Sequence, residues 1–386
     1  MRIIFFDYVC ELDKPGESGL SDIVWNIASR LQVYGDDVHI VAPYSVDSKP
    51  ANHVIVHRFR LPPVGYRNII GHILIVLAGS REISRLEPAD VIHVPEYLSS
   101  GILPILHRRT PVVLSVPGNI HHRIRNKASF DWPTDQVFKA TSWITARRCA
   151  RIVATCELMR KWWEVGGTSP SKLVVIPYGF DADVFRPIPG ARTLLGIDDK
   201  TSVILYVGRL QSRTKGLEFL LRAVHSLASK IDCLQLHIVG SGPDAQHLDA
   251  QARDLGIRNM VVFHGWVRQK DLAPYYSAAD VTVLPSFAEG QPRTMWEAMA
   301  CGSAFLGSEG VIDDIVDGET GFLAPPRNAQ ALAAKLDQVL THTATRRSVA
   351  LNGTHFAHQY ANWDTVVRRI REEVYEPLAS RRPTIG

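Results

Sequence analysis

Two glutamates around a predicted helix start give the strongest chemical signal in this chain. Glu289 lies in a loop after a predicted strand that ends at Leu284, and Glu297 lies inside the helix that follows. Pro292 in the first helical turn and Gly302 just past the last turn mark the limits of this helix. A helix start presents backbone N–H groups to an anion, and carboxylates accept hydrogen bonds from hydroxyl groups. The segment therefore predicts a site for a diphosphate that carries a hydroxyl-rich group. The alternative from spacing alone is a solvated Glu289 and a Glu297 that only complements the helix dipole.

Three further predicted strand ends carry residues that suit a phosphorylated ligand. One strand ends at Gly208, and Arg209 and Lys215 precede the next helix. An arginine fork and a mobile ammonium both suit phosphate oxygens, although two surface cations at a loop is the simpler interpretation of this pair alone. The glycine-rich turn at Gly240 and the stretch His264–Val267 follow two other strands. They could present backbone to a ligand or serve only as tight packing and ordinary loop.

Alternating strands and helices must position these loops. Short Val/Ile-rich runs alternate with amphipathic stretches, which is typical of parallel sheets with crossover helices. Prolines and glycines between residues 177 and 190 interrupt the pattern as a linker would, and the pattern then restarts. The expected fold class is α/β with two doubly wound parallel sheets, in which ligands bind beyond the carboxyl ends of the strands. The sequence predicts no helix or strand between the strands expected at 91–94 and 112–116.

The composition fits an enzyme of a reducing compartment. The 386 residues are 46% hydrophobic and carry a net charge of +4, which suits an anionic small ligand and does not require nucleic acid. The five scattered cysteines form no C-x-x-C pair, so neither a disulfide framework nor a zinc site is expected. The first apolar run is too short for a signal peptide. The longest run, 69–78, is broken by His72 and is too short to span a bilayer. A cytoplasmic protein is expected, with any membrane contact at the inner face.

The joint order of these motifs resembles that of the retaining GT-B glycosyltransferases of family four, the glycosyl transferases of group 1. The matching segments are residues 175–187, 207–210 with 215–216, 239–243, 263–267, 279–286, 289–302 and 317–323. The resemblance implies two Rossmann-like domains that face each other across a cleft. Residues 1–185 would form the acceptor-side domain and 186–362 the donor-binding domain. Residues 363–386 would form a helix that crosses back to the first domain.

The resemblance also implies roles for the charged residues. Arg209 and Lys215 would bind the donor diphosphate and stabilise its departing charge, Glu297 would hold the ribose hydroxyls, and Glu289 would contact the transferred sugar. The family retains the anomeric configuration by front-face attack, in which the leaving phosphate takes the acceptor proton. This chemistry is electrostatic, so neither a metal nor a cofactor is expected.

The remaining donor contacts implied by the resemblance come largely from backbone. Gly19, after the first strand, would approach the diphosphate from the other domain, because only glycine allows so close a backbone approach. The other positions are Gly208, Gly240, His264, Val267, Gly290 and Gln291.

One departure from the family pattern falls at a sugar-contacting position. Family members commonly carry a His-Gly pair after the strand expected at 112–116, and this chain has Pro117-Gly118 instead. Proline cannot supply the missing imidazole. His121 or His122 could replace it, with plain loop histidines as the alternative.

The function expected from the resemblance is transfer of a hexose or N-acetylhexosamine from a nucleotide-diphosphate sugar, with a UDP-sugar favoured, to a small-molecule, glycan or lipid-linked acceptor. Two alternatives stay open. One is a nucleotide-sugar epimerase or hydrolase of the same fold, and the other is a non-catalytic nucleotide-sugar-binding protein.

A basic and aromatic stretch raises the question of a lipid surface. Trp143 with Arg147 and Arg148, and then Lys161-Trp162-Trp163, could form a peripheral membrane patch. The alternative is that the aromatic side chains pack in the core and the basic side chains form an ordinary solvated face.

Overall fold

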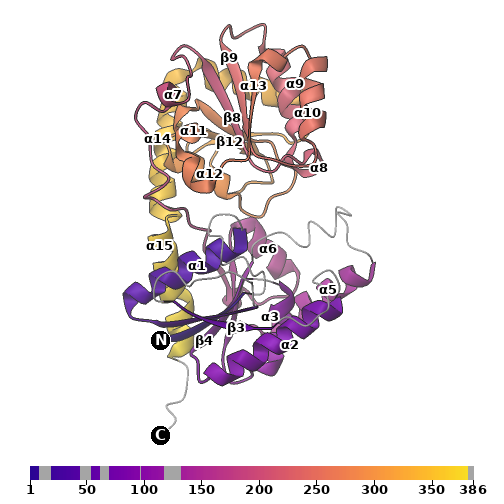
Figure 1. The fold of residues 1–386 in the computed structure, drawn as a ribbon, viewed down its shortest axis with the longest axis vertical. Helices are drawn as coiled ribbons and strands as arrows, with labels where there is room; N and C mark the ends of the chain where they lie inside the picture. The colour runs from indigo at the N-terminus through magenta and orange to yellow at the C-terminus, as the bar shows by residue number, and fades with distance from the viewer. Residues whose placement is uncertain (8–18, 44–53, 61–68, 96, 117–131, 381–386) are drawn as a thin grey trace. The chain divides into compact units, whose positions relative to one another are not determined.

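The computed structural model describes residues 1–7, 19–43, 54–60, 69–95, 97–116 and 132–380, and it divides the chain into two compact units. The first unit takes in residues 1–178 and the residues from Trp363 onward, and the second takes in residues 179–362 (Figure 1). The second unit begins before the predicted boundary after residue 185, because Phe180 and Phe185 pack in its core.

The first unit is built on a seven-stranded sheet in which all pairs are parallel, in the order β3-β2-β1-β4-β5-β6-β7. Its strands are β1 (Arg2–Phe6), β2 (Asp37–Pro43), β3 (Ile55–Phe59), β4 (Val91–Val94), β5 (Val112–Val116), β6 (Arg151–Ala154) and β7 (Leu173–Val175). Its described helices before residue 178 are α1 (Gly19–Leu31), α2 (Ile69–Leu86), α3 (Tyr97–Leu106), α5 (Trp132–Arg148) and α6 (Glu157–Val165). The first six positions of this order are those of a dinucleotide-binding fold.

Alternate side chains of β1 face two separate cores. Ile3 and Phe5 pack with α1 and the C-terminal segment, whereas Ile4 and Phe6 pack on the opposite face with residues of α2, α3 and α5. This is the period-two alternation of a strand buried on both faces. No helix among the described residues is long and apolar enough to cross a membrane.

The C-terminal segment completes one of these two cores. It comprises α15 (Trp363–Arg369), a π-helical stretch, η5 (Ile370–Tyr375), and α16 (Glu376–Ala379). α15 lies beside α1 (Figure 1), and Arg30 Nε contacts Asp364 Oδ1 at 3.1 Å. Five apolar side chains of this segment are at most 3% exposed, namely Trp363, Val366, Val367, Ile370 and Val374.

A buried histidine ties this segment to the sheet. His93 of β4 shares a hydrogen bond with the Tyr375 hydroxyl through Nδ1, and a second one of 2.6 Å with Ser115 Oγ through Nε2. Burial lowers the pKa of His93 from 6.5 to about 3. The imidazole is therefore neutral in the folded protein, where one ring nitrogen donates and the other accepts.

We expect this histidine to make the protein less stable in acid. Because the unfolded chain binds the proton at pH 6.5 and the folded chain only near pH 3, the free energy of unfolding falls as the pH drops through this window. The slope from one such group is at most about 1.4 kcal/mol per pH unit. Urea unfolding at pH 7 and pH 5 should show a smaller loss for His93→Gln than for the wild type or for His225→Gln, which replaces an exposed histidine. An equal loss in all three proteins would contradict the assignment.

The second unit is also a doubly wound parallel sheet, with six strands in the order β10-β9-β8-β11-β12-β13. Its strands are β8 (Ser202–Val207), β9 (Leu234–Val239), β10 (Val261–Gly265), β11 (Val281–Leu284), β12 (Ala304–Ser308) and β13 (Phe322–Ala324). Its helices are α7 (Ala191–Leu194), α8 (Ser212–Lys215), α9 (Leu217–Leu227), α10 (Ala245–Asp254), α11 (Ala273–Ala278), α12 (Arg293–Ala300), α13 (Ala329–Thr341) and α14 (Thr343–Tyr360). The predicted pair of doubly wound α/β sheets is thus confirmed.

Helix α3 is the main element that the sequence did not predict. It occupies the interval between β4 and β5, contains Pro104 and is apolar over most of its length. An internal proline and the lack of a polar face both remove the usual signs of a surface helix. Packing against α5 stabilises it instead.

Candidate functional site

The residues predicted to act together follow four adjacent strands of the second sheet. The four strands are β10, β9, β8 and β11, and the strand order reverses between β8 and β11. Because the strands are parallel, their carboxyl ends lie at one edge, which is where ligands bind in such sheets. The residues at or after these ends are Gly208, Arg209, Lys215, Gly240, His264, Val267, Glu289, Gly290 and Gln291.

Lys215 and Glu289 form an ion pair that joins two of these loops. Lys215 Nζ lies 2.6 Å from Glu289 Oε1, and the two side chains are 22% and 11% exposed. The Phe287 amide donates to the Thr214 carbonyl at 2.8 Å, so the end of α8 and the loop after β11 are also joined through backbone. Gly216 permits this approach, since a Cβ there would lie 2.0 Å from the Pro285 carbonyl oxygen. Glu289 is therefore a paired carboxylate and not a solvated one.

Arg209 presents a second cation on the neighbouring loop. Its side chain is exposed and has no hydrogen-bond or ion-pair partner among the described residues. Its backbone is held by the Tyr206 hydroxyl, which donates to the Arg209 carbonyl at 2.9 Å. Burial, and then the charge of Glu289, raises the pKa of Tyr206, so this hydroxyl keeps its proton. The backbone of Arg209 is thus held in place, while its guanidinium is open to an anion.

Glu297 is a buried and oriented carboxylate. It lies on α12 and is 4% exposed; its Oε1 accepts from Gln269 Nε2 at 2.8 Å, and its Oε2 accepts from the Tyr276 hydroxyl at 2.9 Å. Burial and then Glu297 itself raise the pKa of Tyr276, so Tyr276 remains a donor. Each carboxylate oxygen retains acceptor capacity for a ligand hydroxyl. A role for Glu297 limited to the helix dipole does not account for these two bonds.

Gln269 and Tyr276 are the partners that the sequence analysis missed. Gln269 lies in a short helical turn before α11 and Tyr276 lies within α11, but nothing in their spacing relates them to Glu297. A tyrosine inside a short helix is ordinarily read as core, and Tyr276 is fully buried.

The predicted limits of α12 are confirmed by the structure. The helix spans Arg293–Ala300, with Pro292 as its N-cap and Gly302 in the left-handed region after it. Gln291 is buried, and its Nε2 donates to Asp314 Oδ2 at 3.0 Å. The loop that carries Gly290 is therefore anchored from both sides, by Asp314 and by Lys215.

Close packing explains the glycine turn after β9. A Cβ at Gly240 would lie 1.9 Å from the Gly208 carbonyl oxygen, and Gly240 has a φ of +139°. Its amide donates to the Gly265 carbonyl at 2.7 Å. The turn after β9 therefore bridges the loops after β8 and β10, whichever ligand lies above it.

Two neutral imidazoles meet across neighbouring strands, His237 on β9 and His264 on β10. His264 Nε2 is 3.0 Å from His237 Nδ1, and the His264 ring meets Tyr275 edge to face at 4.9 Å. Burial, together with His264, lowers the pKa of His237 from 6.5 to about 4, and burial lowers that of His264 as well. Near neutral pH both rings therefore offer hydrogen bonds and no charge. Val267, further on, packs against the core.

The other predicted site residues belong to the first unit. Gly19 is the first residue of α1. His121 and His122 lie outside the described residues. The basic and aromatic stretch divides in two: Trp143 is 56% exposed with the Arg147 guanidinium 4.0 Å from its ring centre, whereas Trp163 is 3% exposed and belongs to the core.

Comparison with protein families finds two matches along the chain. A model described as Glycosyltransferase Family 4 matches residues 18–184, and one described as Glycosyl transferases group 1 matches residues 201–342. The chain is 30% identical to a D-inositol 3-phosphate glycosyltransferase of Geodermatophilus obscurus, over 92% of this chain and 85% of that protein.

Two solved structures share the fold. Sucrose-phosphate synthase of Thermosynechococcus elongatus superposes with a TM-score of 0.82 at 22% identity, covering 98% of this chain and 99% of that one. HepE of Anabaena in complex with UDP-glucose gives a TM-score of 0.76 at 20% identity, covering 97% and 100%.

Proposed function

This chain belongs to the family 4 glycosyltransferases, the glycosyl transferases of group 1, and we propose that it transfers a hexose or N-acetylhexosamine from a UDP-sugar to an acceptor hydroxyl with retention of anomeric configuration. The observation that carries the proposal is the pairing of Lys215 with Glu289 at the carboxyl edge of the second sheet, where Arg209 also lies with no side-chain partner among the residues that the structure describes.

The two cations would stabilise the departing diphosphate. Charge builds on the leaving phosphate as the bond to the sugar breaks, and positioned cations stabilise that charge more in the transition state than in the ground state. Arg209 is open to the phosphate before it arrives. Lys215 is held by Glu289, so the ammonium is already in place when a phosphate oxygen takes over part of its bonding.

The two carboxylates would hold the neutral parts of the donor. Once phosphate shares Lys215, Glu289 can accept a hydrogen bond from a sugar hydroxyl. Glu297, held by Gln269 and Tyr276, would accept from the ribose. The leaving phosphate would take the acceptor proton, and this requires no additional side chain as a base.

The named relatives suggest the first substrates to test. HepE holds UDP-glucose on the same fold, and the Geodermatophilus relative is named for D-inositol 3-phosphate. UDP-glucose is therefore our first donor and a phosphorylated polyol our first acceptor. A lipid-linked acceptor at the inner face of a membrane is a further proposal, which rests on exposed Trp143 and Arg147.

We expect product only when donor and acceptor are both present. Purified protein would be incubated with UDP-, GDP- and ADP-sugars and with inositol phosphate, free glycans or phosphatidylinositol vesicles, each reaction being run with and without EDTA. NMR of the product should show the anomeric configuration of the donor. Release of free sugar or of a sugar isomer in the absence of acceptor would favour the hydrolase or epimerase. Donor binding without turnover would favour the non-catalytic binding protein. Activity that is lost in EDTA and restored by magnesium would overturn the metal-free mechanism.

A further inference from the structure

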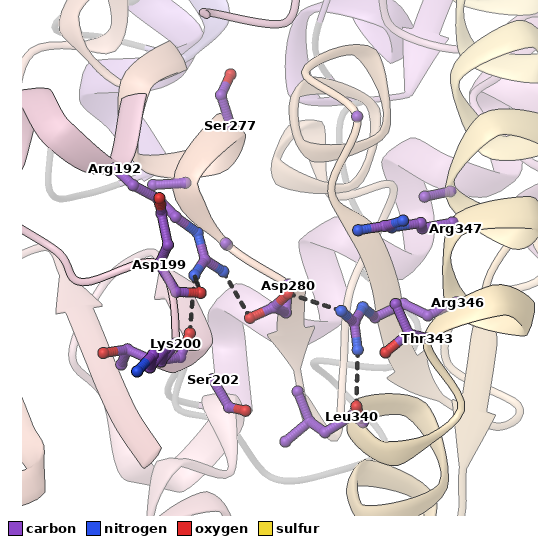
Figure 2. A pocket seen from close by; sticks show the side chains of 15 residues that line it. Arg192, Asp199, Lys200, Ser202, Ser277, Asp280, Leu340, Thr343, Arg346 and Arg347 are labelled. Carbon is purple, nitrogen blue, oxygen red and sulfur yellow. Dashed lines mark hydrogen bonds and ion pairs between the residues drawn. The ribbon is translucent and has the colours of Figure 1, made fainter. Parts of the chain in front are cut away.

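A pocket opens at the opposite edge of the second sheet, where β8, β11 and β12 begin (Figure 2). Its volume is about 530 Å³, which is within the range of small-molecule sites. Its walls come from the segments before β8 and β11, the residues after α12, and the start of α14. Arg209 lies beyond the carboxyl end of β8, whereas Ser202, which lines the pocket, lies at the amino end of the same strand. The two sites are therefore separated by the length of β8.

Two arginines in this pocket are fixed by a shared aspartate. Arg192 Nη2 lies 2.8 Å from Asp280 Oδ2, and Arg346 Nη2 lies 2.8 Å from Asp280 Oδ1. Arg192 Nη1 also donates to the Thr201 carbonyl at 2.9 Å, and Arg346 Nη1 donates to the Leu340 carbonyl at 2.8 Å. These contacts hold the trio in place, and it carries one excess positive charge.

Two more basic side chains line the pocket without such contacts. The side chains of Lys200 and Arg347 are exposed and have no hydrogen-bond or ion-pair partner in the part of the chain that the structure describes. Arg347 extends from α14 toward the same side as Arg346 (Figure 2). The pocket lining thus holds four basic side chains against the two acids Asp199 and Asp280.

The neutral lining adds donors of the kind that phosphate accepts. The hydroxyls of Ser202, Ser277 and Thr343 line the pocket, and Thr343 is the first residue of the 18-residue helix α14. The N-terminus of a helix favours negative charge, and arginine with lysine binds phosphate oxygens by charge-assisted hydrogen bonds.

We propose that this pocket binds the phosphate group of a small phosphorylated metabolite. Lys200 and Arg347 are the recruiting cations, and the Arg192–Asp280–Arg346 trio is the rigid floor. A volume of about 530 Å³ leaves room for the rest of a molecule of sugar-phosphate or nucleotide size. This binding does not depend on the transferase chemistry, because none of these residues lies at the carboxyl edge of the sheet.

Inorganic pyrophosphate is the probe for this site, measured by calorimetric titration. Lys200→Gln with Arg347→Gln should weaken one class of pyrophosphate sites about tenfold or more, since each lost charge-assisted hydrogen bond is worth about that factor. The control, Arg222→Gln with Lys230→Gln, removes the same number of exposed cations from residues of the same unit that do not line the pocket, and it should leave that class unchanged. Arg192 and Arg346 are left intact because removing either would leave Asp280 with a broken ion pair.

Three titration results would overturn the proposal. Equal losses in the two double variants would show a non-specific charge effect, and no loss in either would show no site. If Arg209→Ala, which leaves the pocket residues intact, bound no pyrophosphate at all, the binding would belong to the carboxyl edge of the sheet and not to this pocket. A crystal soaked in tungstate provides an independent readout, with an anomalous peak expected in the pocket beside Lys200 or Arg347 and its absence counting against the site.

Discussion

Replacing Arg209 by alanine should lower turnover by about two orders of magnitude or more and leave the melting temperature unchanged. The activity loss is the scale seen when one group that stabilises transition-state charge is removed. The unchanged stability follows from the structure, because the exposed guanidinium has no partner among the described residues. Initial rates with UDP-glucose and thermal unfolding of the same preparation measure both quantities.

Lys215→Ala should match Arg209→Ala in activity and differ from it in stability. Removal of the ammonium leaves the carboxylate of Glu289, only 11% exposed, without its ion-pair partner. An unpaired, largely buried charge costs about 1–3 kcal/mol of folding free energy, so the melting temperature should fall.

Lys335→Ala is the matched control for this variant. Lys335 is 23% exposed, close to the 22% of Lys215, and it also pairs with a carboxylate, Asp317, at 3.1 Å. It lies on α13, and its partner Asp317 precedes β13 and does not follow any of the four strands that carry the candidate site, so its loss should leave turnover unchanged. Full activity in Arg209→Ala and Lys215→Ala would dismiss the diphosphate role, and an equal loss in Lys335→Ala would reduce it to a general effect of charge.

Glu297→Gln should lower kcat/KM for the donor by about 10- to 100-fold, the equivalent of one hydrogen bond to a charged group. The substitution preserves shape, but the new amide nitrogen would face either Gln269 Nε2, which can only donate, or the Tyr276 hydroxyl, which would have to turn and accept. A local effect on stability is therefore expected too, and activity alone cannot identify the ribose contact.

A double-mutant cycle with modified nucleotides separates the two effects. Wild-type protein should bind UDP more tightly than 2′-deoxy- or 3′-deoxy-UDP, and Glu297→Gln should bind all three alike, because the coupling energy is lost with the carboxylate. Tyr276→Phe should reduce this discrimination part of the way, since it frees Glu297 to rotate. If Glu297→Gln discriminates as well as the wild type, the ribose role is wrong.

The edge of the sheet at which the candidate site lies could be predicted from the sequence. Gly208, Gly240 and Glu289 each follow a short Val/Ile-rich run, and in a parallel sheet such positions lie at one edge whatever the loops do. Pro292 and Gly302 likewise predicted the limits of α12, because both residues act through local backbone geometry. The family motifs depend on the same short-range order.

What only the tertiary structure decided is which side chains meet. Lys215 and Glu289 are 74 residues apart, Gln269 and Glu297 are 28 apart, and Arg346 and Asp280 of the second pocket are 66 apart. Helix α3 and the start of the second unit at residue 179 also depend on packing against distant elements. Residue type and spacing predict local conformation and strand ends, whereas a hydrogen bond or ion pair between distant residues depends on how crossovers and loops place their atoms within a few ångströms.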